Sequence, residues 1–128
     1  MTSNKTIIAT KNAPAAIGPY SQATTNGQLI FTAGQIAIDP KTGTIVPGNI
    51  EAQTHQAIRN IEEILRVIDI DLEAVMKTTV FMTNLADFTH MNKVYEQYFD
   101  NNPPARSAVE VAALPLGAQI EIECIAMK

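Results

Sequence analysis

The stretch from Asn101 to Glu123 constrains the fold more than any other part of the chain. Its Pro103-Pro104 pair fixes two φ angles and pushes the preceding residue toward extended backbone, so a helix must end before it. Arg106 to Val111 and Ile120 to Ile125 then carry the two-residue period that is typical of half-buried strands. Leu114-Pro115-Leu116-Gly117 connects them, so the sequence predicts a β-hairpin at the end of the chain.

Two amphipathic helices are predicted upstream of this stretch. The longer one begins after Asn49, a good N-cap, and has Glu51 in its first turn, where a carboxylate suits the helix dipole. Its apolar stripe has three- and four-residue spacing: Ala57, Ile58, Ile61, Ile64, Leu65 and Ile68. The second helix is expected to use Asp87 as its cap. Its inward face should hold Phe88, Met91, Val94, Tyr95, Tyr98 and Phe99.

Three further strands are predicted, at Lys5 to Thr10, Gln28 to Gln35 and Ala74 to Met82. The second is almost entirely apolar or small, which indicates burial on both faces, and Asp39 to Gly43 has the residues of a turn. Strands and helices in this order predict an α+β fold, a mixed sheet with two helices packed on one face. In the last strand, the isoleucines should face these helices, with Glu121 and Glu123 on the opposite face.

Composition bounds the class of protein. A chain of 128 residues is enough for one domain, spanning residues 1–128. Charged residues make up 17%, below the average of roughly 25%, which indicates that another subunit covers part of the surface. The net charge is −4 and no cluster of Lys or Arg occurs, so nucleic acid and membranes are poor candidates as partners. Cys124 is the single cysteine, and no apolar leader begins the sequence, which favours the cytoplasm.

Several common chemistries have no support in the sequence. Phosphate-binding glycine loops and the GxSxG nucleophile motif are absent. His55 and His90 lie on different predicted helices without HxxxH or CxxC partners, so no metal site is expected. Cys124 falls in the apolar phase of its strand, where a thiol is ordinarily inert packing.

Arg106 and Glu121 are the candidate functional pair. The planar guanidinium of an arginine matches a carboxylate with two parallel hydrogen bonds, and a glutamate can act as a general base. The structural alternative is a salt bridge from Arg106 to Glu121 or Glu110 on a solvated strand.

Four segments together resemble the reactive-intermediate deaminase family, also known as the YjgF family of imine deaminases. They are AAIGPYSQA (15–23), TAGQIAIDPKTG (32–43), KTTVFMTNLADF (77–88) and PPARSAVEVAALP with IEIE (103–115 and 120–123). The resemblance implies a chorismate-mutase-like fold and a homotrimer with three clefts between subunits. It also implies hydrolysis of 2-imino acids, such as 2-iminobutanoate and 2-iminopropanoate, to 2-oxo acids and ammonia, with no metal or organic cofactor.

The resemblance also assigns roles to particular residues. Arg106 matches the arginine that holds the substrate carboxylate, and Glu121 matches the glutamate that activates water. Tyr20, Gly34 and Asn92 match residues that line the cleft. Ala108 stands where many relatives have cysteine, and the family role there involves the backbone carbonyl. Ala33 likewise replaces a common serine, so a hydroxyl contact at that position is not expected.

Other functions remain open at this level. The same cleft could be a regulatory module that binds 2-oxo acids without turnover, for which Arg106 alone would suffice. Relatives have also been described as ribonucleases, translation inhibitors and chaperones. The acidic composition and the missing His/Lys constellation argue against RNA cleavage.

Overall fold

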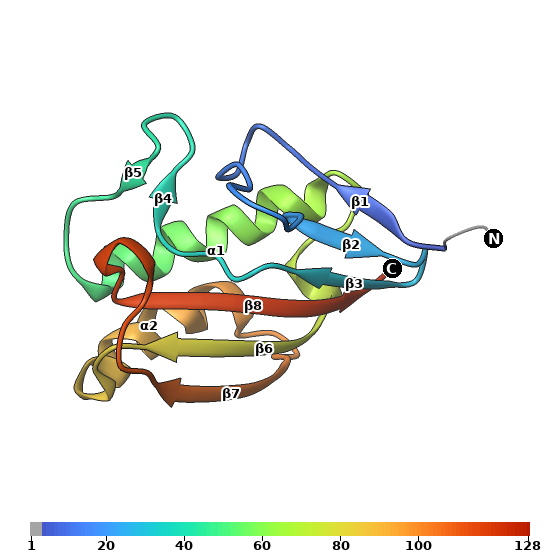
Figure 1. Ribbon diagram of the computed structural model, residues 1–128. Coiled ribbons are helices and arrows are strands. Elements are labelled where there is room, and N and C mark those ends of the chain that lie inside the picture. The colour runs from blue at the N-terminus through green and yellow to red at the C-terminus, as the bar shows by residue number, and fades with distance from the viewer. Residues whose placement is uncertain (1–3) are drawn as a thin grey trace.

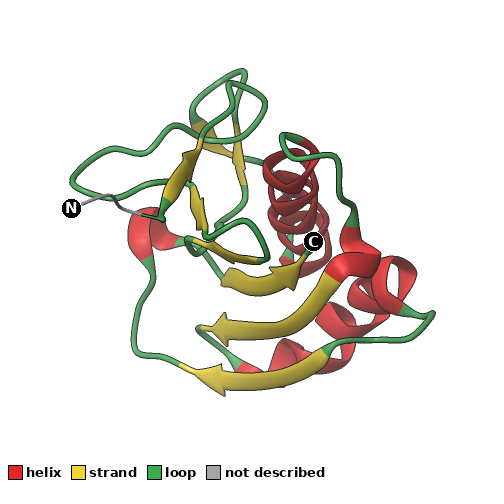
Figure 2. Ribbon diagram, turned by 90° about the vertical axis from the view of Figure 1, so that its right-hand side faces the viewer, coloured by secondary structure: helices red, strands yellow, loops and turns green. Residues whose placement is uncertain are grey.

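A computed structural model of the chain describes residues 4–128. A six-stranded sheet in the order β1-β2-β3-β8-β6-β7 is covered on one face by two helices (Figure 1). The turned view shows both helices on the same side of the strands (Figure 2). The predicted α+β fold, a mixed sheet with two helices on one face, is therefore confirmed. Within residues 4–128, neither helix has the length and apolar character needed to cross a bilayer.

The helices and the longer strands follow the predicted order, to which the structure adds short strands at residues 23–25, 38–39 and 44–45. The strands of the main sheet are β1 (Thr6–Ile8), β2 (Ala23–Thr25), β3 (Leu29–Thr32), β6 (Val75–Met82), β7 (Ala105–Glu110) and β8 (Ile120–Met127). The helices are α1 (Ile50–Arg66) and α2 (Phe88–Phe99). A small ribbon of β4 (Ile38–Asp39) and β5 (Thr44–Ile45) closes around the predicted turn, where Gly43 donates to the Asp39 carbonyl over 2.8 Å.

Helix α1 forms as its sequence predicts. The Asn49 side chain accepts hydrogen bonds from the backbone N–H groups of Glu51 (3.1 Å) and Ala52 (3.4 Å), which satisfies two donors that a helix start leaves free. The apolar stripe from Ala57 to Leu65 is buried against the sheet, and Ile68 packs against the same core just beyond the helix.

The start of helix α2 differs from its prediction. Asp87 occupies the N-cap position but makes no capping hydrogen bond. A short 3₁₀ turn, η2 (Leu85–Asp87), precedes the helix, and Asn84 caps this turn by accepting from the Ala86 N–H over 2.9 Å. The inward face is confirmed: Met91, Val94, Tyr95 and Phe99 are buried, and Phe88 and Tyr98 pack against the core.

The predicted C-terminal hairpin is wrong. Strand β7 pairs in parallel with β6, with Thr78 opposite Arg106, while β8 lies on the other side of β6 and pairs with it antiparallel. The reason is that β6, α2 and β7 form a crossover unit, in which the helix packs on the sheet and returns the chain in the same direction. A two-residue period shows that a segment is a strand, but it does not identify the strand's neighbours.

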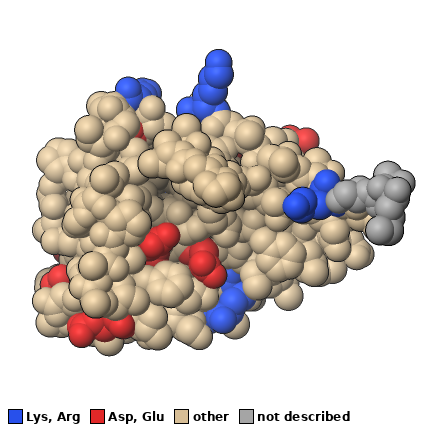
Figure 3. Space-filling view, viewed as in Figure 1, with Lys and Arg blue, Asp and Glu red and all other residues tan. Residues whose placement is uncertain are grey.

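The sheet face opposite the helices is open in the single chain. Strand β3 was expected to be buried on both faces, but only Ile30 and Thr32 are buried, while Leu29 and Phe31 are exposed on this open face. Neighbouring positions on it are also apolar: Phe81, Val109, Ile125 and Met127. The open face is largely uncharged, with acidic side chains near its middle (Figure 3). The strand positions of Glu121 and Glu123 on this face agree with the prediction.

Candidate functional site

A cleft opens beside the start of β8 and contains three of the predicted site residues. Its volume is about 570 Å³. Tyr20 comes from the loop before β2, Gly34 from the segment after β3, and Glu121 from β8. The remaining lining residues are Pro14, Ala15, Ile17, Gln22, Ala33, Gln35, Ile36, Ile38, Pro115 and Leu116.

Glu121 and Gly34 are in close contact in this cleft. A Cβ atom built on Gly34 would lie 2.7 Å from the Glu121 Cδ and 2.9 Å from its Cγ, so only a glycine leaves room for the carboxylate in this position. Gln35 holds the segment beside β8, because its N–H donates to the Ile122 carbonyl (2.8 Å) and its carbonyl accepts from the Ile122 N–H (3.0 Å).

The cleft tunes the acidity of Glu121. Burial raises the pKa of the Glu121 carboxyl above its usual value, because a charged group loses hydration there, and the nearby Glu123 charge raises this pKa further. A carboxylate whose pKa is raised is, in its ionised form, a stronger base than an ordinary glutamate. This is the electrostatic state expected of a residue that takes a proton from water.

Tyr20 lies on a loop that a single buried amide holds in place. The Gln22 Nε2 donates to the carbonyls of Thr10 (3.0 Å), Ala13 (3.3 Å) and Pro14 (2.7 Å), and its Oε1 accepts from the Thr10 N–H (2.7 Å). These bonds join residues 10–14 to the start of β2, so one wall of the cleft has a defined position. This role of Gln22 was not predicted from the sequence. The only signal for it was that Gln22 lies within the family-like segment AAIGPYSQA.

Arg106 lies in a second cavity, of about 420 Å³, between β7 and α2. Its Nη1 donates to the Asn92 Oδ1 over 2.8 Å, so these two predicted residues are brought together. The guanidinium carbon lies 4.7 Å from the ring centre of Tyr95 and 5.2 Å from that of Phe88, a cation–π arrangement that holds its plane. Phe88, Asn92 and Tyr95 share one helical face through their four- and three-residue spacing, which was the available signal for this clamp.

Arg106 and Glu121 do not meet within one chain. Arg106 pairs with Thr78 of β6, whereas Glu121 pairs with Phe81, three residues along the same strand. Paired residues share a face and successive residues alternate faces, so Arg106 points toward the helices and Glu121 toward the open face.

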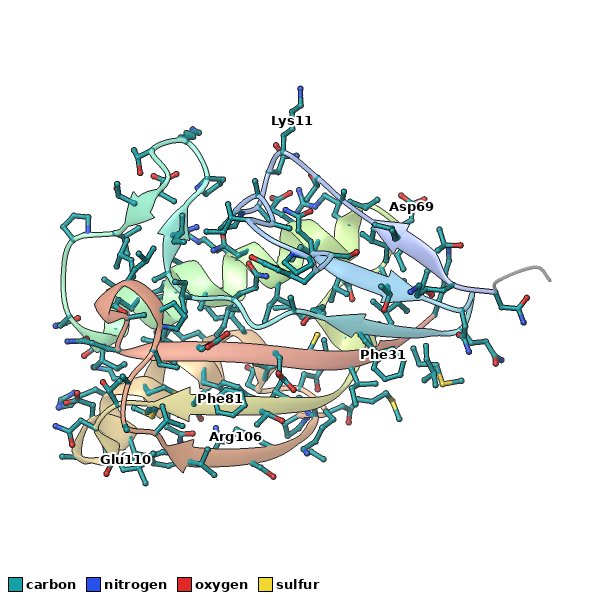
Figure 4. The ribbon with its side chains drawn as sticks, in the orientation of Figure 1. Lys11, Phe31, Asp69, Phe81, Arg106 and Glu110 are labelled. Carbon is teal, nitrogen blue, oxygen red and sulfur yellow. The ribbon has the colours of Figure 1, made fainter. Side chains whose placement is uncertain are left out.

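The structural salt bridge considered for Arg106 is wrong. Among residues 4–128, no ion pair within 4 Å joins Arg106 to Glu121 or Glu110. Arg106 and Glu110 belong to the same strand but lie toward opposite ends of it (Figure 4). The Glu110 Oε1 instead accepts a hydrogen bond from the Leu85 N–H over 2.8 Å.

Ala108 lies on β7, two residues after Arg106 and on the same side. It pairs with Val80 of β6 and packs against the core. Since β7 is an edge strand, its outer backbone groups have no strand partner among residues 4–128. An alanine methyl group leaves these backbone groups accessible, so the role expected for the residue 108 carbonyl stays a prediction.

The single cysteine and the two histidines do not form a site with one another. Cys124 is buried, and burial raises the pKa of its thiol to about 11, so the expected inert thiol is confirmed. The two histidines lie on separate helices, His55 on α1 and His90 on α2. His55 hydrogen-bonds to the Tyr98 hydroxyl over 2.8 Å, and the His90 ring nitrogen lies 3.5 Å from the Glu51 carboxylate. In the part of the chain that the structure describes, no three His, Cys, Asp or Glu side chains are grouped so that they could bind a metal.

Comparison with known proteins defines the family. A family model described as "Endoribonuclease L-PSP" matches residues 10–128. A RutC family protein of Pyrococcus horikoshii is 52% identical over 97% of this chain and 98% of its own length. The human 2-iminobutanoate/2-iminopropanoate deaminase is 46% identical over 95% of this chain and 89% of its own length.

A solved structure has the same fold. Escherichia coli TdcF, a crystal structure with bound serine, superimposes with a TM-score of 0.92 at 41% identity, covering 96% of this chain and 98% of TdcF. The chain therefore belongs to the reactive-intermediate deaminase, or YjgF, family, as the resemblance indicated.

Proposed function

We propose that this chain hydrolyses 2-imino acids to 2-oxo acids and ammonia, in clefts formed between copies of the chain in a homotrimer. The observation that carries the proposal is the separation of Arg106 from Glu121. The fixed guanidinium lies at the edge strand β7, and the base lies in a cleft on the other face of the same sheet. Both can act on one substrate only if a second copy supplies one of them.

The relatives support this assignment. The human relative is named for deamination of 2-iminobutanoate and 2-iminopropanoate, and TdcF holds serine, whose α-carboxylate is shared with all 2-imino acids. The two cavities fit such a molecule in complementary ways. Arg106 offers a planar donor pair for the carboxylate, and Glu121 offers a proton acceptor close to the cleft surface.

The reaction follows from these two groups. Arg106 binds the substrate carboxylate and so orients the C=N carbon for attack by water. This proximity and orientation lower the barrier to attack. Water attacks the C=N carbon of the protonated imine while Glu121 takes one of its protons. Glu121 then returns this proton to the amine nitrogen and the C–N bond breaks. The hydroxyl proton passes to solvent water, which leaves a 2-oxo acid and ammonia. An iminium beside a carboxylate is already electrophilic, so we propose that neither a metal nor an organic cofactor is needed.

Ammonia and 2-oxo acid release gives the direct test of the activity. An amino-acid oxidase generates the imine in situ, and the enzyme-dependent rate is corrected for spontaneous hydrolysis. We expect Arg106→Lys to lose most of kcat/KM, because a point charge cannot fix the carboxylate plane; the loss of a charged hydrogen bond is worth about 1.5–3 kcal/mol. A lysine variant that matches the wild type would make Arg106 a structural residue only.

Glu121→Gln separates an enzyme from a binding module. The amide resembles the carboxylate in shape but cannot usefully accept a proton, so we expect kcat to fall by about 10²–10⁴-fold. The affinity for 2-oxobutanoate, measured by calorimetry, should remain close to that of the wild type. Glu73→Gln, an exposed carboxylate in the turn after α1, is the matched control. Good affinity without any wild-type hydrolysis would identify a binding module instead.

The description of the family as endoribonucleases suggests RNA as another substrate. The net charge of −4 opposes binding of a phosphate backbone, which depends on Lys and Arg contacts. The lone cysteine, Cys124, suits a reducing compartment, so we propose that the protein works in the cytoplasm on small carboxylates.

A further inference from the structure

Two unusually exposed apolar side chains lie in the cleft that contains Glu121. In residues 4–128, Ile17 (81% exposed) and Leu116 (68%) are the most exposed of the large apolar residues, and both line this cleft. They come from different loops, Ile17 from the segment before β2 and Leu116 from the connection between β7 and β8. Apolar side chains that converge on one cavity from separate loops are typical of a ligand-binding surface.

The backbone at Leu116 is strained. Its φ of 57° and ψ of 25° are left-handed, a conformation that a bulky residue adopts rarely. Gly117 follows with φ 69°, and the Ala118 N–H donates to the Pro115 carbonyl over 3.1 Å, which closes the turn. Strain of this kind concentrates at ligand-binding sites, where the surrounding structure maintains it. Here it places a leucine, rather than a small turn residue, beside the cleft.

The cleft has more apolar surface than the reaction requires. Of the residues in this cleft, the proposed reaction uses the Glu121 carboxylate, which lies beside Gly34. The cleft also has apolar walls, formed by Pro14, Ala15, Ile17, Ile36, Ile38, Pro115 and Leu116. Its volume of about 570 Å³ falls in the range that encloses ligands larger than a three- or four-carbon acid.

We propose that Leu116 and Ile17 form the surface that receives the substrate's own side chain. This inference rests on the proposed function and adds a preference to it. The site favours 2-imino acids with branched or longer aliphatic side chains over those with a methyl group. The reason is that each additional methylene placed against these residues leaves water, which discriminates between substrates by about 10-fold or more.

Two substitutions at one position test the preference. Leu116→Ala keeps a Cβ in the left-handed conformation, whereas Leu116→Asn provides a residue that tolerates this conformation; both remove the apolar branches. The substrates are imines that an amino-acid oxidase generates from L-leucine and from L-alanine. We expect the leucine-to-alanine ratio of kcat/KM to fall by about 10-fold or more in both variants, because the leucine-derived imine loses more contact than the alanine-derived imine. Val67→Ala, an exposed apolar residue at the end of α1, should leave the ratio unchanged.

A binding measurement separates this inference from the proposed function. Calorimetry compares 4-methyl-2-oxopentanoate with pyruvate, so it does not depend on turnover. Tighter wild-type binding of the longer acid, lost in both Leu116 variants, supports the inference even if no imine is hydrolysed. Equal losses for both ligands and both substrates would overturn it, as would a change in assembly mass in the variants, because Leu116 would then be a structural or interface residue. A preference lost only in Leu116→Ala would also overturn it, since backbone strain and not side-chain contact would be responsible.

Discussion

At the scale of single residues, the contact between Gly34 and Glu121 sets where the proposed base can lie. The φ of Gly34 is not positive, so alanine fits the backbone, but its methyl group would occupy the space of the Glu121 carboxylate. We expect Gly34→Ala to displace this flexible carboxylate and to lower kcat by about 100-fold, since a misplacement of 1 Å can cost that much.

The Gly34→Ala variant also needs a stability measurement. Its thermal unfolding midpoint should stay near that of the wild type, because the crowded atoms, from Cγ outward, all belong to the flexible Glu121 side chain. A variant with full activity would show that the position of the Glu121 carboxylate is not critical for turnover.

The raised pKa of Glu121 predicts how activity depends on pH. The carboxyl accepts a proton only when ionised, so kcat/KM should rise with pH through its raised pKa and then level off. Glu121→Gln should lack this rise. The Glu123 charge contributes to the raised pKa, so Glu123→Gln should move the rise to lower pH. A profile that keeps its position in Glu123→Gln would contradict the electrostatic coupling between the two residues.

The same shift predicts the effect of Glu121 on stability. A folded-state pKa above the unfolded value means that protonation favours folding, a contribution present at low pH and lost as pH rises through the raised pKa. The ionised form of the carboxylate therefore opposes folding. Glu121→Gln should unfold at the same or a higher temperature than the wild type at pH 7. A clearly lower midpoint in thermal unfolding would contradict this prediction.

At the scale of elements, helix α2 holds the guanidinium that strand β7 carries. Asn92→Ala removes the hydrogen bond to Nη1 but leaves the stacking on Tyr95 and Phe88. We expect KM to rise about tenfold, the equivalent of about 1.4 kcal/mol, with a smaller change in kcat. Lys93→Ala, an exposed neighbour on the same helix, should have wild-type kinetics. An unchanged KM in Asn92→Ala would show that the aromatic rings alone orient Arg106.

At the scale of the whole molecule, the open face of the sheet predicts that copies of the chain assemble. Its exposed apolar residues, including Leu29, Phe31, Val109 and Met127, form the surface that an obligate interface would bury, on the order of 2,000 Å² or more. Light scattering should return three times the 13.9 kDa mass of one chain. A mass of a single chain at micromolar concentration would contradict the trimer.

Phe31→Glu tests whether assembly and activity depend on each other. Phe31 is 46% exposed in the single chain, so its replacement should leave the fold intact while it puts a charge into the proposed interface. We expect monomers without imine hydrolysis, because Arg106 and Glu121 of one chain lie on opposite faces of its sheet. Monomers with full activity would show that a single chain contains the complete site.

Much of the local structure follows from the sequence because short-range physics determines it. The stripe from Ala57 to Leu65 can be buried only by a helix, Asn49 offers the side-chain oxygen that a helix start lacks, and β-branched residues after Ala74 favour a strand. The alternation in β8 also placed Glu121 on the face away from the helices. The candidate residues themselves came from motif resemblance, which carries no distances.

Only the tertiary structure decided which strands pair and which site residues meet. The period of a strand is the same whether its neighbour is parallel or antiparallel, so the placement of β8 between β3 and β6 depends on how α2 packs across the sheet. That placement brings Gly34 to the Glu121 carboxylate, brings Asn92 and Tyr95 to Arg106, and separates the two groups on opposite faces. Contacts between residues distant in the chain arise from packing of whole elements, which no local pattern encodes.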